Sequence, residues 1–274
     1  MEPALLPPGT AAGEPTPLRQ ATGPGPLEMV LVAGLAFFLN LSAGTLLQYA
    51  RPKLGLLVSE IFFIAGPAVL AIRLFYLDRR AILPMRGWRW TDLPAAIVAA
   101  AGLNHLLTMA GAWQETVWPT PTLVRALFDG LFVYRGPLDF AALLVAFALV
   151  PAICEEILFR GFLQSGLARS LDRPASVVAA SALVFALFHL DPWRFTGVLG
   201  LGLFLAWLRL STGSLLPSMT AHAASNVLSI AMKAGGWLDD DAPGSLGSAL
   251  VALVLVAAAI TVIAAGRRAR DRML

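Results

Sequence analysis

The chain has 274 residues, of which 58% are hydrophobic and only 14% are charged, and its formal net charge is +3. Ordinary soluble domains carry about 25% charged residues, because a folded chain needs polar groups to cover its surface in water. The composition excludes a soluble globular protein and indicates an integral membrane protein whose surface is largely covered by lipid. Its basic residues lie mostly near the ends of apolar segments, so the positive charge does not indicate nucleic-acid binding.

Residues 1–26 are rich in proline and glycine and show no apolar periodicity. Such segments cannot bury enough apolar surface to fold, so we expect a disordered cytoplasmic tail over residues 1–26. They also lack the pattern of a cleaved signal peptide, in which a basic region precedes a compact apolar stretch. The first long apolar run, which begins at Leu27, is therefore expected to remain as a membrane anchor.

Long apolar segments follow one another along the rest of the chain. A transmembrane helix needs about 20 apolar residues at a rise of about 1.5 Å per residue. The sequence therefore predicts an all-α fold, a polytopic transmembrane helical bundle of about eight spans. The predicted spans are residues 27–49, 54–77, 93–113, 138–168, 174–190, 195–209, 215–234 and 245–265.

The segment PTPTLVRALFDGLFVYRG, between the third and fourth spans, places Arg125 and Asp129 within an apolar pattern. This pattern predicts an amphipathic helix that lies at the membrane interface. Residues 27–136 are thus expected to form an N-terminal unit of transmembrane helices plus this interfacial helix. A C-terminal transmembrane helix over 245–265 and a basic cytoplasmic tail over 266–274 are expected at the other end.

Basic residues near the span ends predict that both termini lie in the cytoplasm, because cytoplasmic loops tend to retain Lys and Arg. An even number of spans places both termini on one side, and the acidic run at 239–241 then lies on the opposite side. The preference for Ala and Arg over Ile and Lys suggests a GC-rich bacterial genome, so we expect the bacterial inner membrane. The cytoplasmic arginines in this orientation are Arg19, Arg79, Arg80, Arg86, Arg89, Arg169, Arg173, Arg209, Arg267, Arg268, Arg270 and Arg272.

Some conspicuous residues are assigned structural roles. Cys154 is the only cysteine, so it can form no intramolecular disulfide and is expected to pack among apolar side chains. His105 matches no motif and is expected to make a hydrogen-bonded contact between helices. Gly197, Gly200 and Gly202 follow no strand and are expected to allow close helix packing.

The ionisable residues within predicted spans are more informative, because a charge at the centre of a bilayer costs roughly 2.5–3.5 kcal/mol or more. Such residues are by default functional or paired with one another. In the fourth, fifth and seventh spans, the informative ionisable residues are Glu155, Glu156, Arg160, His189 and His222. The amide side chain of Asn226 lies in the seventh span together with His222.

Helical geometry separates the roles of these residues. Glu156 and Arg160 are four residues apart and can form an ion pair, whereas Glu155 points about 100° away and has no local partner. Glu155 is therefore free to supply a carboxylate to a shared cavity. His222 and Asn226 are also four residues apart, so they present an imidazole and an amide on one helix face.

The predicted turn near Asp172 places Glu155 and His189 at similar depth, because each lies 17 residues from it. A carboxylate beside an imidazole can take a proton from water and return it to a leaving group. An imidazole and an amide can stabilise the oxyanion of a tetrahedral intermediate. These groups predict peptide-bond hydrolysis by an attacking water, since no serine or cysteine lies in an obvious nucleophile motif.

Three motifs resemble those of a known family. Residues 155–160 (EEILFR) resemble an EExxxR motif, residues 185–189 an FxxxH motif, and residues 222–226 an HxxxN motif. Their order resembles that of the CPBP (Abi) family of intramembrane endopeptidases, which includes Rce1-like CaaX-processing proteases and bacterial members linked to bacteriocin processing and immunity. The resemblance covers about residues 137–234 and implies an Rce1-like fold with a catalytic CPBP-like core there.

The resemblance also implies a role for each residue of the three motifs. Glu155 and His189 would activate water, and His222 and Asn226 would stabilise the oxyanion. Three further residues would support the site, which would open toward the cytoplasm: Glu156, Arg160 and Phe185.

Three alternatives stay open. Glu155, His189 and His222 also form an alternative zinc set, although the absence of an HExxH helix favours a mechanism without a cofactor. A proton-coupled transporter would also place Glu and His in the membrane, although no inverted repeat is apparent. The third alternative is a non-catalytic immunity protein. The expected partners are the lipid bilayer and a membrane-associated peptide or protein precursor, and the oligomeric state is not indicated.

Overall fold

The computed structural model describes residues 23–235 and 244–271, and in these ranges the chain forms helices and no strand. The predicted all-α fold is confirmed. The tail predicted over residues 1–26 lies outside the described residues except for 23–26, and the acidic run at 239–241 lies outside them as well.

Helices occupy all eight predicted spans. Among the described residues, six helical runs are long and apolar enough to cross a membrane, so the protein is a multi-pass membrane protein. The other two are α11 (Pro174–Phe188), which has only 15 residues, and α13 (Leu215–Ala234), whose Ser, Thr, His and Asn side chains lower its mean hydropathy. The six runs are Pro26–Ala50, Pro52–Leu74, Asp92–Val117, Pro137–Ser170, Phe195–Thr212 and Leu246–Arg268.

Three of these runs contain turns of π-helix, in which the backbone bonds run from residue i to i+5. Two of these turns, η2 and η3, end two residues before buried prolines, Pro67 and Pro151. A proline removes one backbone N–H and its ring crowds the carbonyl four residues earlier, so a wider turn relieves the clash. The segments are α1 (Pro26–Leu39), η1 (Asn40–Gly44), α2 (Thr45–Ala50), α3 (Pro52–Val58), η2 (Ser59–Ala65), α4 (Gly66–Leu74), α8 (Pro137–Leu144), η3 (Val145–Leu149), α9 (Val150–Glu156), η4 (Ile157–Leu163) and α10 (Gln164–Ser170).

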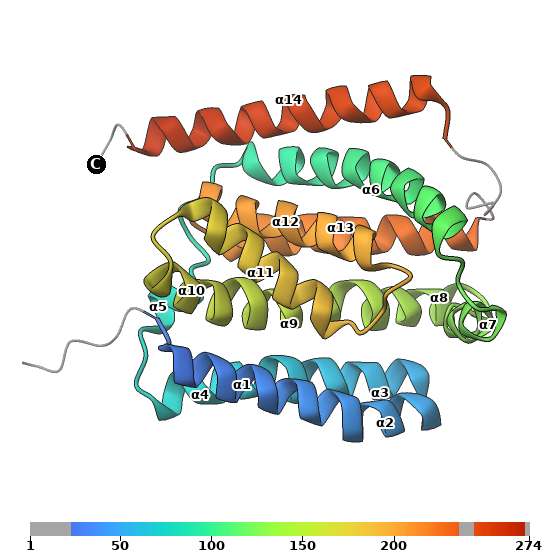
Figure 1. Cartoon of the computed structure of the whole chain (residues 1–274), viewed down its shortest axis with the longest axis horizontal. Helices are drawn as coiled ribbons and strands as arrows, with labels where there is room; N and C mark the ends of the chain where they lie inside the picture. The colour runs from blue at the N-terminus through green and yellow to red at the C-terminus, as the bar shows by residue number, and fades with distance from the viewer. Residues whose placement is uncertain (1–22, 236–243, 272–274) are drawn as a thin grey trace, which may run out of the picture.

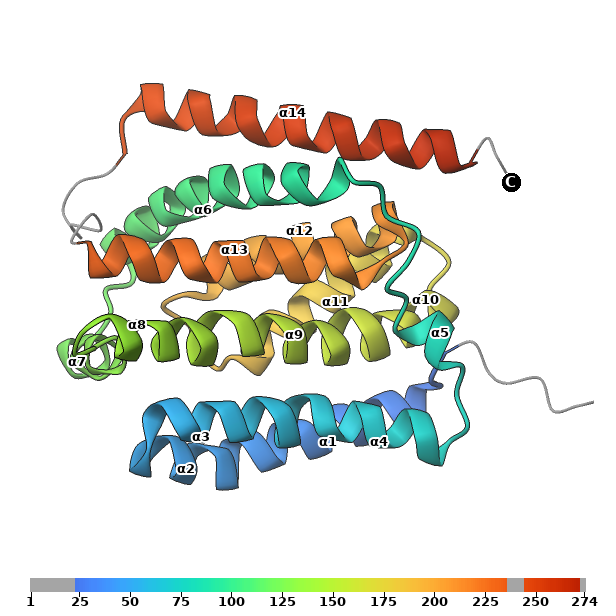
Figure 2. The ribbon, with the colours of Figure 1, turned by 180° about the vertical axis from the view of Figure 1, so that it is seen from behind.

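The remaining helices are α5 (Arg79–Ile82), α6 (Asp92–Val117), α7 (Thr122–Leu131), α12 (Phe195–Thr212) and α14 (Leu246–Asp271). Figures 1 and 2 show α7 nearly end-on, lying across one end of the bundle, as expected of an interfacial helix. It has no buried residue. Because α14 continues to Asp271, the basic tail predicted from residue 266 is helical over its first residues.

The spatial order of the helices differs from their order in the chain. Figures 1 and 2 show α14 and α6 on one side, the run α1–α4 on the other, and α8–α10 between the run α1–α4 and the pair α12 and α13. Accordingly, α9 packs against η2 on one side and against α13 on the other. The helix that carries Glu155 and Glu156 is therefore at the centre of the bundle.

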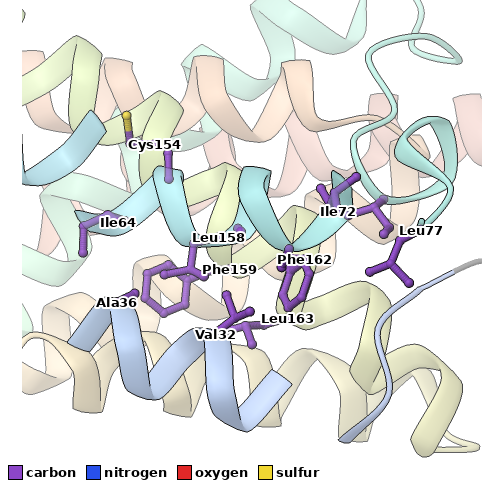
Figure 3. Close-up of a cluster of buried hydrophobic side chains, with 14 of the residues drawn as sticks. Val32, Ala36, Ile64, Ile72, Leu77, Cys154, Leu158, Phe159, Phe162 and Leu163 are labelled. Carbon is purple, nitrogen blue, oxygen red and sulfur yellow. The ribbon is translucent and has the colours of Figure 1, made fainter. Parts of the chain in front are cut away.

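An apolar cluster holds this central run against the N-terminal helices. Figure 3 shows Leu158 and Phe162 among side chains of α1, η2 and α4, with Cys154 in the same cluster. Cys154 is buried, as predicted. His105 Nε2 lies 2.9 Å from Ser248 Oγ, which confirms its predicted contact between helices.

Close packing of the glycines is confirmed at two of the three predicted positions. A Cβ atom added at Gly200 would meet Leu107, and one added at Gly202 would lie 3.1 Å from Phe185 Cδ1. At Gly197 nothing lies within 4 Å of such an atom, so the prediction is wrong there.

Candidate active site

Glu156 and Arg160 form a fully buried ion pair where α9 passes into η4. Both side chains are 0% exposed, and Arg160 Nη1 lies 3.0 Å from Glu156 Oε1. The i, i+4 pair predicted from helical spacing is therefore present. Because removing two charges from water costs several kcal/mol per ion, each of these residues depends on the other to stay charged in the bundle.

His222 lies between the two glutamates. Its Nδ1 is 3.2 Å from Glu156 Oε1, and its Nε2 is 3.7 Å from Glu155 Oε2. The Glu155 side chain is 13% exposed, so it lies at the edge of the buried cluster. Ser218, one turn before His222 on α13, lies beside the Glu156 carboxylate as well. One chain of contacts thus runs from the carboxylate of Glu155 through the His222 imidazole and the Glu156 carboxylate to the Arg160 guanidinium.

Phe185 forms the wall of this cluster. The Arg160 guanidinium carbon lies 4.1 Å from the centre of the Phe185 ring, within the range of a cation–π interaction. The His189 and His222 rings meet the same ring edge-on, with centroids 4.7 and 5.9 Å away. Gly202 on α12 allows this close approach, and its carbonyl accepts a hydrogen bond from Arg160 Nη2 at 3.3 Å.

His189 and Asn226 are placed near the cluster but not against Glu155. His189 is the C-cap residue of α11, and its Nδ1 lies 2.8 Å from the carbonyl of Phe185 in that helix. The next residue, Leu190, has a φ of 50°, an uncommon left-handed conformation that turns the chain away. Asn226 is half-buried one turn after His222. In the part of the chain that the structure describes, neither side chain bonds to Glu155.

The alternative zinc set does not assemble in this arrangement. Within residues 23–235 and 244–271, no three His, Cys, Asp or Glu side chains are grouped so that they could hold a metal ion. Both ring nitrogens of His222 face carboxylates, and Nδ1 of His189 faces a backbone carbonyl. The structure thus shows no assembled zinc set among these residues, and no step is assigned to a metal.

Glu60 is a site residue that the sequence reasoning missed. It lies in η2, is only 5% exposed, and its Oε2 is buried with no hydrogen-bond partner among the described residues. It is close enough to Glu155 for the two charges to interact. The signal was in the sequence: an acidic residue in an apolar span, the same criterion that selected Glu155.

The fold and this cluster together define a class of protein: a multi-pass helical membrane protein with acid, base and guanidinium groups buried at mid-bundle. Residues 137–228 match the family model described as "Type II CAAX prenyl endopeptidase Rce1-like". The chain therefore carries an Rce1-like domain, which confirms the resemblance to the CPBP family over this stretch. The match supports an intramembrane protease of the CAAX type. Comparisons with curated proteins and with solved structures gave no match.

Proposed function

We propose that the protein is a glutamate- and histidine-dependent endopeptidase that hydrolyses a peptide bond of a membrane-associated peptide or protein precursor. The observation that carries the proposal is the contact chain from Glu155 through His222 and Glu156 to Arg160. Arg160 neutralises Glu156, and Glu156 holds Nδ1 of His222. Nε2 of His222 and the carboxylate of Glu155 are then left to face the reacting groups.

In the proposed reaction, Glu155 takes a proton from a water molecule as the water oxygen bonds to the carbonyl carbon of the substrate. His222 and Asn226 stabilise the resulting oxyanion, with about 2.7–4 kcal/mol for each such donor. The proton then passes to the amide nitrogen as the carbon–nitrogen bond breaks. His189 completes the base with Glu155 once substrate is bound, since catalytic hydrogen bonds are often long in an unliganded enzyme.

An apolar cavity beside the site supports a substrate that lies in the membrane. It has a volume of about 600 Å³ and is lined by the run η3–α9–η4, by α13, and by residues in and just after α5. Leu149 of η3, Ile153 of α9 and Ile157 of η4 line one side of it, and Leu149 and Ile153 are exposed on the protein surface. We propose that an apolar segment of the substrate enters here from the lipid and reaches the cluster at Glu155 and His222.

The unpaired oxygens of Glu155 and Glu60 are suited to accept hydrogen bonds from the attacking water. Replacing Glu60 by leucine is expected to lower the cleavage rate about 3- to 10-fold, since one such hydrogen bond contributes about 0.5–1.5 kcal/mol. Glu60→Gln keeps an acceptor oxygen and should lose less. Initial rates on reconstituted enzyme measure the difference, with Ser59→Ala as the control because Ser59 faces Gln48 instead. Equal rates for Glu60→Leu and the wild type would remove Glu60 from the site.

Two further features belong to the proposal. The enzyme works without a metal, which is supported by the absence of an HExxH helix from the sequence. It resides in a bacterial inner membrane with both termini in the cytoplasm. Figure 1 supports a common side for the two ends, because α1 begins and α14 ends at the same end of the bundle. Arg79, Arg80 and Arg169 belong to α5 and α10, which also lie at this end.

Quantitative mapping of new peptide termini in membrane fractions tests the proposal. Cells that express the wild type are compared with cells that express Glu155→Ala or His222→Ala, at matched protein levels. Fragments that appear with the wild type and disappear with both variants support an endopeptidase. Cys154→Ala is the control, because Cys154 neighbours Glu155 yet faces the apolar cluster. If fragment patterns are identical in all strains, the endopeptidase proposal is wrong.

A further inference from the structure

A second cavity lies apart from Glu155 and His222, at the end of the bundle where α5 and α10 meet the last turn of α12. It has a volume of about 250 Å³, and its polar lining comes from Arg160, Gln164, Ser165, Arg169 and Arg209. Figure 1 shows α5 and α10 at the end of the bundle where α1 begins and α14 ends. The cavity therefore extends from Arg160 toward this end of the bundle.

The lining of this cavity is strongly basic. Three arginines line it and no acidic side chain does. Arg160 Nη1 forms the ion pair with Glu156, and Nη2 donates a hydrogen bond to the Gly202 carbonyl. The Nε of Arg160 is buried with no hydrogen-bond partner in the described part of the chain. Arg209 also has a buried Nε without such a partner.

The charges around the cavity do not cancel. Glu156 acts on both Arg160 and Arg209, and it already pairs with Arg160 and His222, while Glu155 acts on Arg160 as well. Arg169 donates Nη1 to the backbone carbonyl of Gly23, which carries no charge. Arg169 is exposed to solvent, whereas Arg209 is partly buried and its unpartnered Nε is unfavourable unless an acceptor such as an anion joins it.

We propose that this cavity binds the phosphate group of an anionic phospholipid headgroup, with Arg160, Arg169 and Arg209 as donors. A guanidinium group presents parallel N–H donors that match phosphate oxygens, and such charge-assisted bonds are stronger than neutral ones. The cavity lies at the end of the spans, where basic pockets between helices can take lipid headgroups. Free phosphate has the same chemistry, so the experiment must separate the two sources.

Arg160 connects this cavity to the active site. Its Nη1 pairs with Glu156, the residue also lines the cavity, and its Nε has no hydrogen-bond partner among the described residues. A bound phosphate would therefore fix Arg160 in place and with it the Glu156–His222 contact. The binding itself does not rest on the proposed proteolysis, whereas this effect on the active site does.

Native mass spectrometry of the full-length protein in detergent tests the binding. The probes are phosphatidylglycerol, a diacylglycerol with the same acyl chains, and inorganic phosphate. The wild type is expected to retain phosphatidylglycerol at least about tenfold more strongly than diacylglycerol, and Arg209→Gln should lose about tenfold in affinity. Arg169→Gln is a second variant for the case in which Arg209→Gln does not fold. Arg173→Gln, an exposed arginine at the N-cap of α11, is the control and should bind as the wild type does.

Two results would overturn the proposal. The first is equal retention of phosphatidylglycerol by the wild type and both cavity variants. The second is stabilisation by inorganic phosphate without preferential retention of phosphatidylglycerol, which would assign the cavity to a soluble anion. The effect on the active site is read separately: phosphatidylglycerol should raise the cleavage rate of the wild type but not of Arg209→Gln. If lipid binds as expected but no fragment is ever produced, the proposed proteolysis fails and the lipid site stands.

Discussion

Replacing Glu155 by glutamine is expected to lower the rate of peptide cleavage by about 10²- to 10⁴-fold, the contribution of a positioned general base. The amide keeps the size of the side chain and its place 3.7 Å from the His222 ring, but it cannot accept the proton of the attacking water. The buried ion pair of Glu156 and Arg160 is untouched, so the protein should unfold at the same temperature. Initial rates on purified enzyme in vesicles, together with a thermal melt, measure both quantities.

Cys154→Ala is the matched comparison for Glu155→Gln. Cys154 precedes Glu155 on α9 and lies in the apolar cluster with Leu158 and Phe162. Its loss should lower stability slightly and leave the cleavage rate within about threefold of the wild type, because it removes packing but no catalytic group. The reverse pattern, in which Cys154→Ala abolishes cleavage and Glu155→Gln does not, would point to a thiol nucleophile and against the water mechanism.

The second large effect is on stability. Arg160→Met leaves Glu156 charged and buried without its cation, and breaking a buried pair in this way costs about 3–5 kcal/mol. The double variant Glu156→Gln with Arg160→Met removes both charges, so it should regain most of the lost stability. Thermal unfolding of the three proteins in one detergent measures the difference. The double variant is not expected to cleave substrate, because Glu156→Gln removes the charged partner of His222 Nδ1.

If Arg160→Met unfolds at the wild-type temperature, the Glu156–Arg160 ion pair contributes little to stability, which would contradict the expected loss. A double variant no more stable than the single one would show that Arg160 acts mainly through its contacts with Phe185 and Gly202. Arg173→Met is the control for a charge change at an exposed position, and it is expected to stay within about 0.5 kcal/mol of the wild type.

Properties that depend on one helix alone were predictable from the sequence. Span length and composition predict the helices, and the i, i+4 spacing predicts the Glu156–Arg160 pair from one helix alone. Helix α13 also occurs where it was predicted, although its polar residues make it less apolar than a typical span. Its polarity has a physical reason, since it presents Ser218 and His222 to the glutamates rather than to lipid.

Properties that depend on which helices touch were not predictable. The run α8–α10 lies between helices that come both before and after it in the chain, so Glu60 reaches Glu155 from a span that no spacing argument connects to it. The depth argument placed His189 level with Glu155, but α11 ends at Phe188 and turns at Leu190. Counting residues from a turn gives the position of a side chain along the helix axis. Two side chains touch only if they also lie on helix faces that point toward each other, and the packing of the bundle determines those faces.

The central claim is that Glu155 activates a water molecule that breaks a peptide bond. The most direct measurement is cleavage of an identified precursor by purified enzyme in water enriched in oxygen-18, with mass spectrometry of the new C-terminus. The wild type is expected to place one heavy oxygen in the new carboxylate in a single turnover, with no dependence on added chelator, while Glu155→Gln releases almost no product. Unchanged cleavage and labelling by Glu155→Gln would contradict the claim.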